Sequence, residues 1–220
     1  MEKSRAVVFA GGELADPQAV RAILQPGDRL VAADGGYLHM KKLGLRPHLL
    51  VGDLDSLPVE EIESLRAAGV ELEIFPREKN ETDLELALLR LAKEGFVEIR
   101  VVAALGGRLD QTLANLYLLE MDALKGIDVR LDDGREEILI IRDRADVSGV
   151  PGDTLSLLAL DGCTRGITTR GLKYPLNGDT LCQSRTRGVS NVMLEDIVTV
   201  EVRSGSLLCI HTRQPETQKG

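Results

Sequence analysis

The sequence predicts an α/β protein with an N-terminal open, mostly parallel sheet, helices on both of its faces, and a C-terminal all-β sandwich. Up to about residue 131, short apolar runs alternate with amphipathic stretches, as in βαβ units around a parallel sheet. From about residue 135, short alternating segments are separated by glycine and proline, which is typical of a small sandwich or barrel. We expect two domains, 1–133 and 134–220, divided at the polar turn 132–134.

In the first domain, the expected strands are the apolar runs Ala6–Ala10, Leu30–Ala33, Leu49–Val51, Leu72–Phe75, Ile99–Ala104 and Val129–Leu131. Capping residues predict the helices between them. Asp16 before Pro17 is an N-cap followed by proline in the first turn. Thr82 and Glu85 form a capping box. Two further helices are expected over 60–68 and 112–124, because a glycine follows each.

In the second domain, the clearest strand signals are Glu137–Arg142, Thr154–Ala159, Gly166–Thr169 and Ile197–Val202. Three cysteines accompany them: Cys163, Cys182 and Cys209. Their number is odd, their spacing is wide, and no C-x-x-C pair occurs. This pattern predicts reduced thiols in a cytoplasm and not a disulfide framework or a zinc site.

Composition excludes several classes of partner. The chain has 220 residues, 27 basic and 35 acidic, which gives a formal net charge of −8. Such an acidic excess argues against a nucleic acid or an anionic membrane surface as the main partner. The chain contains no apolar run of about 18 residues, the length that spans a membrane. The N-terminal apolar run is also shorter than the about 7–15 residues of a signal peptide. We therefore expect a soluble, cytoplasmic protein.

Glycines or charged residues follow five of the expected strands. These clusters are Gly11-Gly12, Asp34-Gly35-Gly36, Gly52-Asp53-Leu54-Asp55-Ser56, the segment from Lys79 to Asp83, and Gly106-Gly107-Arg108-Leu109-Asp110. The carboxyl ends of parallel strands share one edge of a sheet, which is where ligands bind. Each cluster alone could be a turn or a helix cap. Together they predict one ligand site.

The residue types indicate a phosphorylated ligand. Backbone N–H groups in glycine turns and at helix N-termini bind phosphate. Carboxylates beside them would repel a polyphosphate unless Mg²⁺ lies between the two. Lys79 and Arg108 could neutralise charge on a transferred phosphoryl group. The sequence contains neither a P-loop nor a dinucleotide fingerprint. Phosphoryl-type transfer is therefore expected, with a Mg²⁺-dependent nucleotide hydrolase and a non-catalytic nucleotide sensor as the alternatives.

Four motifs, in order, resemble the thiamine pyrophosphokinase family, also called thiamine diphosphokinase. They are AADGGYLHMKKLGLRPHLLVGDLDSL, FPREKNETDLELAL, ALGGRLDQTLANLYLL, and GLKYPL followed by GVSN. The resemblance implies an α/β nucleotide-binding domain and a β-sandwich that binds thiamine. It also implies a homodimer with active sites at the subunit interface. The implied reaction moves the pyrophosphoryl group of ATP to the hydroxyethyl oxygen of thiamine, with Mg²⁺, and releases AMP.

The resemblance also implies roles for individual residues. The acids that would bind Mg²⁺ and pyrophosphate are Asp53, Asp55, Asp83 and Asp110, of which the last three, with Arg108, would be catalytic. The implied nucleotide, phosphate or substrate contacts are Asp34, Gly35, Lys79, Thr82, Gly106, Gly107 and Gln111. Ser190, Asn191 and Tyr174 would contact thiamine. The general base that accepts the proton of the thiamine hydroxyl could be either Asp83 or Asp110.

Two positions depart from the family pattern. Gln111 stands where the family often has histidine, and glutamine cannot act as an acid or base near neutral pH. Tyr174 stands where some members have a tryptophan that stacks on thiamine. A tyrosine ring can still attract the cationic thiazolium, by about 0.5–2 kcal/mol. Alternatively, Tyr174 before Pro175 is only an aromatic residue of a turn.

Overall fold

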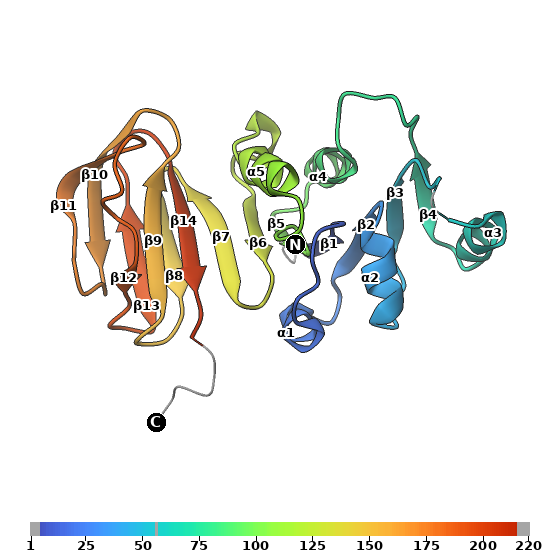
Figure 1. Ribbon diagram of the computed structural model, residues 1–220, viewed down its shortest axis with the longest axis horizontal. Coiled ribbons are helices and arrows are strands. Elements are labelled where there is room, and N and C mark those ends of the chain that lie inside the picture. The colour runs from blue at the N-terminus through green and yellow to red at the C-terminus, as the bar shows by residue number, and fades with distance from the viewer. Residues whose placement is uncertain (1–4, 56, 215–220) are drawn as a thin grey trace. The chain divides into compact units, whose positions relative to one another are not determined.

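The computed structural model describes residues 5–55 and 57–214, so that Ser56 of the GDLDS motif lies outside the described residues. The chain divides into two compact units, residues 1–133 and 134–220. Figure 1 shows the strands of the second unit in yellow to red. Across the described ranges, none of the helices combines the length and the apolar character needed to cross a membrane.

A parallel sheet forms the centre of the first unit. Its described strands pair in the order β6-β5-β1-β2-β3-β4, and every pairing is parallel. The strands are β1 (Arg5–Phe9), β2 (Arg29–Ala33), β3 (Leu49–Gly52), β4 (Glu71–Ile74), β5 (Glu98–Val102) and β6 (Asp128–Asp132). The chain runs outward from β1 to β4 and then continues at β5 on the other side of β1. The carboxyl ends of β1 and β5 therefore form the topological switch point of the sheet.

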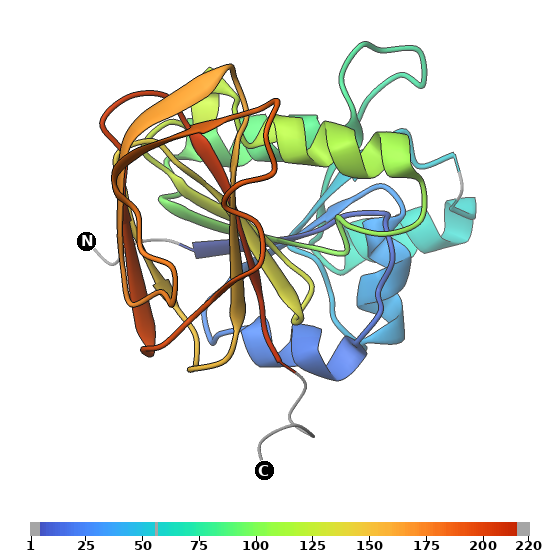
Figure 2. The same ribbon diagram turned by 60° about the vertical axis from the view of Figure 1, so that its left-hand side comes forward.

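Helices cover both faces of this sheet, as predicted. They are α1 (Pro17–Ile23), α2 (Gly36–Lys42), α3 (Val59–Ala67), α4 (Asp83–Glu94), α5 (Leu109–Leu118) and a short 3₁₀ helix, η1 (Asp122–Leu124). Figure 2 shows α1 and α2 on one face and α4 and α5 on the other. The expected caps are present: the Asp16 carboxylate accepts the N–H groups of Gln18 and Ala19, and Thr82 accepts the N–H of Glu85.

Two helices differ from the prediction. Helix α2 was not predicted, because it is only seven residues long and begins at glycine, a poor helix former. The helix expected over 112–124 begins earlier, at Leu109, and ends at Leu118. It ends there because Met121 is extended, with ψ 134°, and the chain re-enters a helical turn only at η1.

The second unit is a sandwich of two antiparallel sheets, which settles the choice between sandwich and barrel. One sheet pairs β12-β9-β14-β7 and the other β11-β10-β13-β8. The strands are β7 (Glu136–Ile141), β8 (Arg144–Ser148), β9 (Thr154–Ala159), β10 (Cys163–Arg170), β11 (Asn177–Cys182), β12 (Asn191–Val192), β13 (Ile197–Glu201) and β14 (Leu207–Thr212). Both sheets contribute to one core, for example Leu157 from β9, Ile167 from β10 and Val200 from β13.

A buried ion pair ties the last strand to the turn before β9. His211 is fully buried, and its Nε2 lies 2.8 Å from Oδ2 of Asp153. Burial opposes the charge on His211, but the carboxylates of Glu137 and Asp153 outweigh it and raise the pKa of the imidazole. The N–H groups of Val150 and Gln214 also donate to Asp153. This network fixes the end of the described chain to the sandwich.

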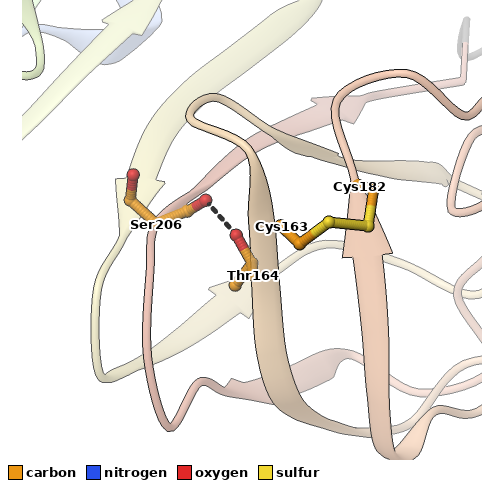
Figure 3. Close-up of a disulfide and its surroundings, with 4 residues drawn as sticks. All are labelled: Cys163, Thr164, Cys182 and Ser206. Carbon is orange, nitrogen blue, oxygen red and sulfur yellow. Dashed lines mark hydrogen bonds between the residues drawn. A yellow bond between two sulfur atoms is a disulfide. The ribbon is translucent and has the colours of Figure 1, made fainter.

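A disulfide joins Cys163 and Cys182 (Figure 3), so the prediction of reduced thiols is wrong for these two residues. Antiparallel pairing of β10 and β11 places the two cysteines directly opposite each other. Nineteen positions separate them in the sequence, and nothing in the spacing indicates this register. Next to Cys163, the Thr164 hydroxyl donates to the carbonyl of Ser206 at 2.6 Å. Cys209 is buried in β14.

Reduction of the disulfide is expected to destabilise the second unit. Opening a loop of this length lowers the free energy of unfolding by about 2–4 kcal/mol, because the unfolded chain regains conformational freedom. Urea unfolding followed with and without dithiothreitol measures the effect. The double variant Cys163→Ser, Cys182→Ser is the control and should not respond to the reductant. Equal responses of the wild type and the double variant would contradict a stabilising role.

Candidate active site

A cavity of about 670 Å³ opens at the carboxyl edge of the parallel sheet. The turns after β1, β2, β3 and β5 line it, together with the start of α4 and one side of α5. It therefore lies at the topological switch point. The predicted site residues that line it are Asp34, Gly35, Asp53, Lys79, Thr82, Asp83, Gly106, Gly107, Arg108 and Gln111.

Close backbone contacts hold the turns around this cavity together. A Cβ on Gly36 would lie 1.8 Å from the carbonyl oxygen of Phe9, and one on Gly12 would lie 2.6 Å from that of Ala103. Both distances are too short for any side chain. Glycine is therefore required where α2 starts against the end of β1, and where the turn after β1 meets the end of β5.

Several backbone N–H groups at the cavity are available to a ligand. Those of Gly11, Gly106 and Gly107 have no hydrogen-bond acceptor among residues 5–55 and 57–214. Gly106 and Gly107 also have positive φ, 77° and 66°, which glycine adopts without strain. Successive N–H groups in such a turn bind anions such as phosphate.

Backbone strain is concentrated at the predicted motifs. In the described ranges, the non-glycine residues with positive φ are Asp34, Leu54, Ala103 and Ser190, at 43° to 58°. The first three follow β2, β3 and β5, and Ser190 belongs to the GVSN motif. This conformation disfavours residues with a side chain and tends to persist where function requires it.

The carboxylates at the cavity repel one another. Partial burial raises the pKa of Asp34, the N–H of Gly35 opposes this by donating to the carboxylate, and repulsion from Asp83, Asp53 and Asp55 raises the pKa further. A cation would relieve this repulsion. Mg²⁺ takes hard oxygen ligands, usually one or two carboxylates with phosphate and water. In the described part of the chain, no group of three acidic, histidine or cysteine side chains is already arranged around a metal position.

Basic residues pair with three of the four predicted metal ligands. Lys79 Nζ lies 3.0 Å from Oδ1 of Asp83, inside the cavity. Two acids, Asp55 and Asp110, do not line the cavity. Asp55 lies 3.2 Å from Nη1 of the exposed Arg77.

Asp110 forms two hydrogen bonds with Arg108, of 2.6 and 3.1 Å. This pairing lowers the pKa of the Asp110 carboxyl and raises that of the Arg108 guanidinium. Both side chains are largely exposed, so the pair adds little to stability. Arg108 can therefore exchange Asp110 for a phosphate ligand at small cost.

Other residues line the cavity that the sequence did not single out, and among them are Glu13, Arg77, Glu81 and Asn115. Asn115 lies one helical turn after Gln111 on α5 and donates to the carbonyl of Ala104 at 2.8 Å. Its helical spacing from Gln111 could have identified it. Glu13 packs against Gly106, where a Cβ would lie 2.7 Å from its Oε2, and this contact has no signal in the sequence.

The predicted thiamine contacts surround a separate cavity of about 250 Å³ in the second unit. Tyr174 and Asn191 line it, and Ser190 lies beside it. The Asn191 side chain accepts the N–H of Tyr174 and donates to its carbonyl, which joins the GLKYPL and GVSN motifs. Tyr174 is 61% exposed as a residue, and the Lys173 ammonium lies 5.6 Å from the centre of its ring. The ring face is therefore accessible to a cation.

These features define a two-unit α/β and β-sandwich protein with a cavity, lined by glycines and charged residues, at the switch point of the first unit. Two family models match the chain: the thiamin pyrophosphokinase catalytic domain over residues 20–131, and the thiamin pyrophosphokinase vitamin B1 binding domain over residues 138–207. The chain belongs to the thiamin pyrophosphokinase family, which confirms the resemblance found in the sequence. The family's members are transferase enzymes.

Individual relatives agree with this assignment. Thiamine pyrophosphokinase of Bacillus subtilis is 28% identical over 185 residues, which span 83% of this chain and 86% of the relative. A crystal structure of thiamine pyrophosphokinase from the same organism superposes with a TM-score of 0.84 at 23% identity, covering 96% of this chain and all of the other. A thiamin pyrophosphokinase family protein from Enterococcus faecalis gives 0.81 at 28% identity, with 96% and 100% covered. The predicted fold class is confirmed.

Replacing Asp34 by asparagine is expected to stabilise the protein at neutral pH in the absence of ligand. The pKa of Asp34 is raised, so ionising it opposes folding as the pH rises through that value. Asparagine removes the charge and tolerates the positive φ. Because Asp34 is exposed, solvent screens part of this repulsion, and we expect Asp34→Asn to raise the melting temperature by no more than about 1–3 °C. Thermal melts at low ionic strength measure this.

The same melts at acidic pH provide the pH control. Once Asp34 is protonated, the wild type and Asp34→Asn are both neutral at this position, and the difference should vanish. Asp122→Asn, at an exposed residue of η1, should cause no rise at either pH. A wild type more stable than Asp34→Asn at neutral pH would contradict the repulsion argument.

Proposed function

We propose that the chain is an ATP:thiamine diphosphotransferase that converts thiamine and ATP into thiamine diphosphate and AMP. Membership in the thiamin pyrophosphokinase family supports this substrate pair. The observation that carries the proposal is the cavity of the first unit, in which unpaired glycine N–H groups lie beside mutually repelling carboxylates. We assign residues 1–133 to nucleotide binding and 134–220 to thiamine binding.

In the proposed reaction, the hydroxyethyl oxygen of thiamine attacks the β-phosphorus of ATP in line. A bond forms between the thiamine oxygen and the β-phosphorus. The bond from the β-phosphorus to the oxygen that bridges it to the α-phosphorus breaks, and AMP leaves with that bridging oxygen. The hydroxyl proton passes to a carboxylate. Lys79, Arg108 and the glycine N–H groups would stabilise the charge that develops on the transferred group.

We assign Mg²⁺ to Asp53, Asp55 and Asp83, with Asp110 as a fourth candidate. When bound, it would shield the triphosphate and withdraw electron density from phosphorus. These acids differ in whether their basic partners hold them inside or outside the cavity. Lys79 holds Asp83 inside the cavity, whereas Arg77 and Arg108 hold Asp55 and Asp110 outside it. Rotation of the exposed Asp55 and Asp110 side chains would bring them to the ligand.

Asp83 is the better candidate for the general base. It lines the cavity at the N-terminal turn of α4, where its Oδ1 is buried beside the Lys79 ammonium, at 3.0 Å. Asp110 lies outside the cavity, and its lowered pKa makes it a weaker base. Gln111 cannot supply this function, so a carboxylate must.

Thiamine would occupy the cavity of the second unit. The exposed ring of Tyr174 suits a cationic thiazolium, which would displace the Lys173 ammonium that lies 5.6 Å from the ring centre. Asn191 fixes the Tyr174 backbone through two hydrogen bonds. A nucleotide hydrolase would have no use for a cation pocket, and a sensor would not need the carboxylates.

Asp55→Asn and Asp83→Asn are each expected to lower the release of AMP by at least about 100-fold. Each loses a ligand for Mg²⁺, and the second also loses the base. Release of AMP from ATP, with Mg²⁺, is measured with and without thiamine. Asp122→Asn on η1 should retain wild-type activity.

The same assay separates the three candidate functions. Release that depends on thiamine supports transfer, release without thiamine supports a hydrolase, and no turnover supports a sensor. Undiminished activity of Asp55→Asn would overturn the assignment of that residue.

We further propose a homodimer with active sites at the subunit interface. Helix α5 supports it, since none of its residues is buried within the described chain. Leu109, Leu113 and Tyr117 follow one another at four-residue spacing and are 72%, 42% and 64% exposed. Such an apolar stripe on one side of a helix suits contact with a second subunit.

A cytoplasmic location is also part of the proposal, because ATP is the donor. The Cys163–Cys182 disulfide is the observation against it, since disulfides are rare in that compartment.

Tyr117→Glu is expected to weaken dimerisation by at least about tenfold, because it would bury a charge in the interface. Size-exclusion chromatography with light scattering, over a range of concentrations, gives the dissociation constant. Val59→Glu is the matched control, because Val59 is also an exposed apolar residue at a helix of the same unit. A monomeric wild type, or equal effects of both variants, would contradict an interface on α5.

A further inference from the structure

His39 contacts the turn that lines the candidate-site cavity, and the proposed mechanism does not use it. It lies on α2, and its Nε2 is 2.9 Å from the carbonyl oxygen of Gly12. A carbonyl oxygen only accepts hydrogen bonds, so Nε2 must carry the proton. The histidine therefore donates to the turn that follows β1.

The segment that His39 contacts is held on its other side by β5. The N–H of Gly12 donates to the carbonyl of Ala103 at 2.7 Å, and that of Glu13 donates to Leu105 at 2.9 Å. The space at Gly12 is too small for a side chain. The peptide groups of residues 12 and 13 are thus fixed from one side by backbone and from the other by one imidazole.

Gly12 and Glu13 form a thin wall between two cavities. They line the 670 Å³ cavity of the candidate site, and they also line a second cavity of about 510 Å³ between α1 and α2. His39 lines only the second cavity, behind the wall. The wall therefore has no packed core behind it, and the His39 hydrogen bond is a polar support on that side.

Packing alone does not explain a histidine at this position. Nδ1 of His39 is buried and has no hydrogen-bond partner among the described residues. A buried ring nitrogen without a partner costs free energy. An apolar residue would avoid this cost, so the compensating contribution has to come from Nε2 and Gly12.

We propose that His39 is a positioning residue for the nucleotide. By holding the Gly12 carbonyl, it keeps the Gly11-Gly12 turn where the unpaired N–H of Gly11 can meet a phosphate oxygen. This inference rests on the proposed function, because it takes the ligand of the cavity to be ATP. It predicts a defect in nucleotide binding that thiamine binding does not share.

The test compares variants of the full chain. His39→Leu removes the donor, His39→Asn is too short to reach Gly12, and His39→Gln can still present an Nε2 donor. We expect the first two to raise the KM for ATP about 3- to 10-fold. Both should leave the KM for thiamine within a factor of about two. His39→Gln should restore most of the wild-type KM for ATP.

His48→Leu is the matched control. His48 also bonds to backbone, accepting the N–H of Leu30 at 2.9 Å, but at the amino end of β2, away from the cavity. Its loss should lower the melting temperature without changing the KM for ATP. An equal rise in His48→Leu would reduce the His39 effect to general destabilisation and overturn the proposal.

Equilibrium dialysis with Mg²⁺ and ATP separates this inference from the proposed function. If the wild type binds ATP but releases no AMP with thiamine, the proposed function fails, and the dissociation constants still test His39. If His39→Leu and His39→Asn bind ATP as tightly as the wild type, the positioning role is wrong. Absence of ATP binding to the wild type would overturn both.

Discussion

Close packing of backbone against backbone at the carboxyl edge of the parallel sheet determines the arrangement of the candidate site. Gly36 touches the end of β1, and Gly12 touches the end of β5, at distances that only glycine permits. Because these contacts fix the turns, the N–H groups of the turns stay at the cavity. Asp34, at the same edge, has a positive φ of 43°, and it lines the same cavity as these turns.

The acidic residues at this edge are stabilised by partners that a ligand can replace. Arg77 and Arg108 are exposed and make ion pairs of the kind that adds little to stability. Lys79 is more buried and holds Asp83 within the cavity. Three of the acids thus have a cationic partner without a ligand, while Asp34 carries the remaining repulsion. Binding of a metal–phosphate complex would redistribute these pairings without rearranging the sheet.

Local signals predicted much of this fold. Apolar runs placed the strands of the first unit within two residues of their ends, and Asp16 and Thr82 marked helix starts, because caps depend on neighbouring residues. Helix α2 was missed because its first residue, Gly36, is a poor helix former that is required there by contact with β1, which is a tertiary requirement. The disulfide was missed because it depends on the register between β10 and β11, which places Cys163 opposite Cys182. The placement of Asp55 and Asp110 outside the cavity depends on Arg77 and Arg108, whose side-chain positions no spacing rule gives.

The disulfide between β10 and β11 also changes the covalent topology of the chain. Residues 163–182 form a closed ring, and the whole GLKYPL motif lies within it. Lys173 and Tyr174 are exposed in this ring and accessible to a protease. Cleavage of the peptide bond between them would leave both fragments joined through sulfur. In the oxidised protein, a nick at the proposed thiamine contact would therefore escape notice on a non-reducing gel.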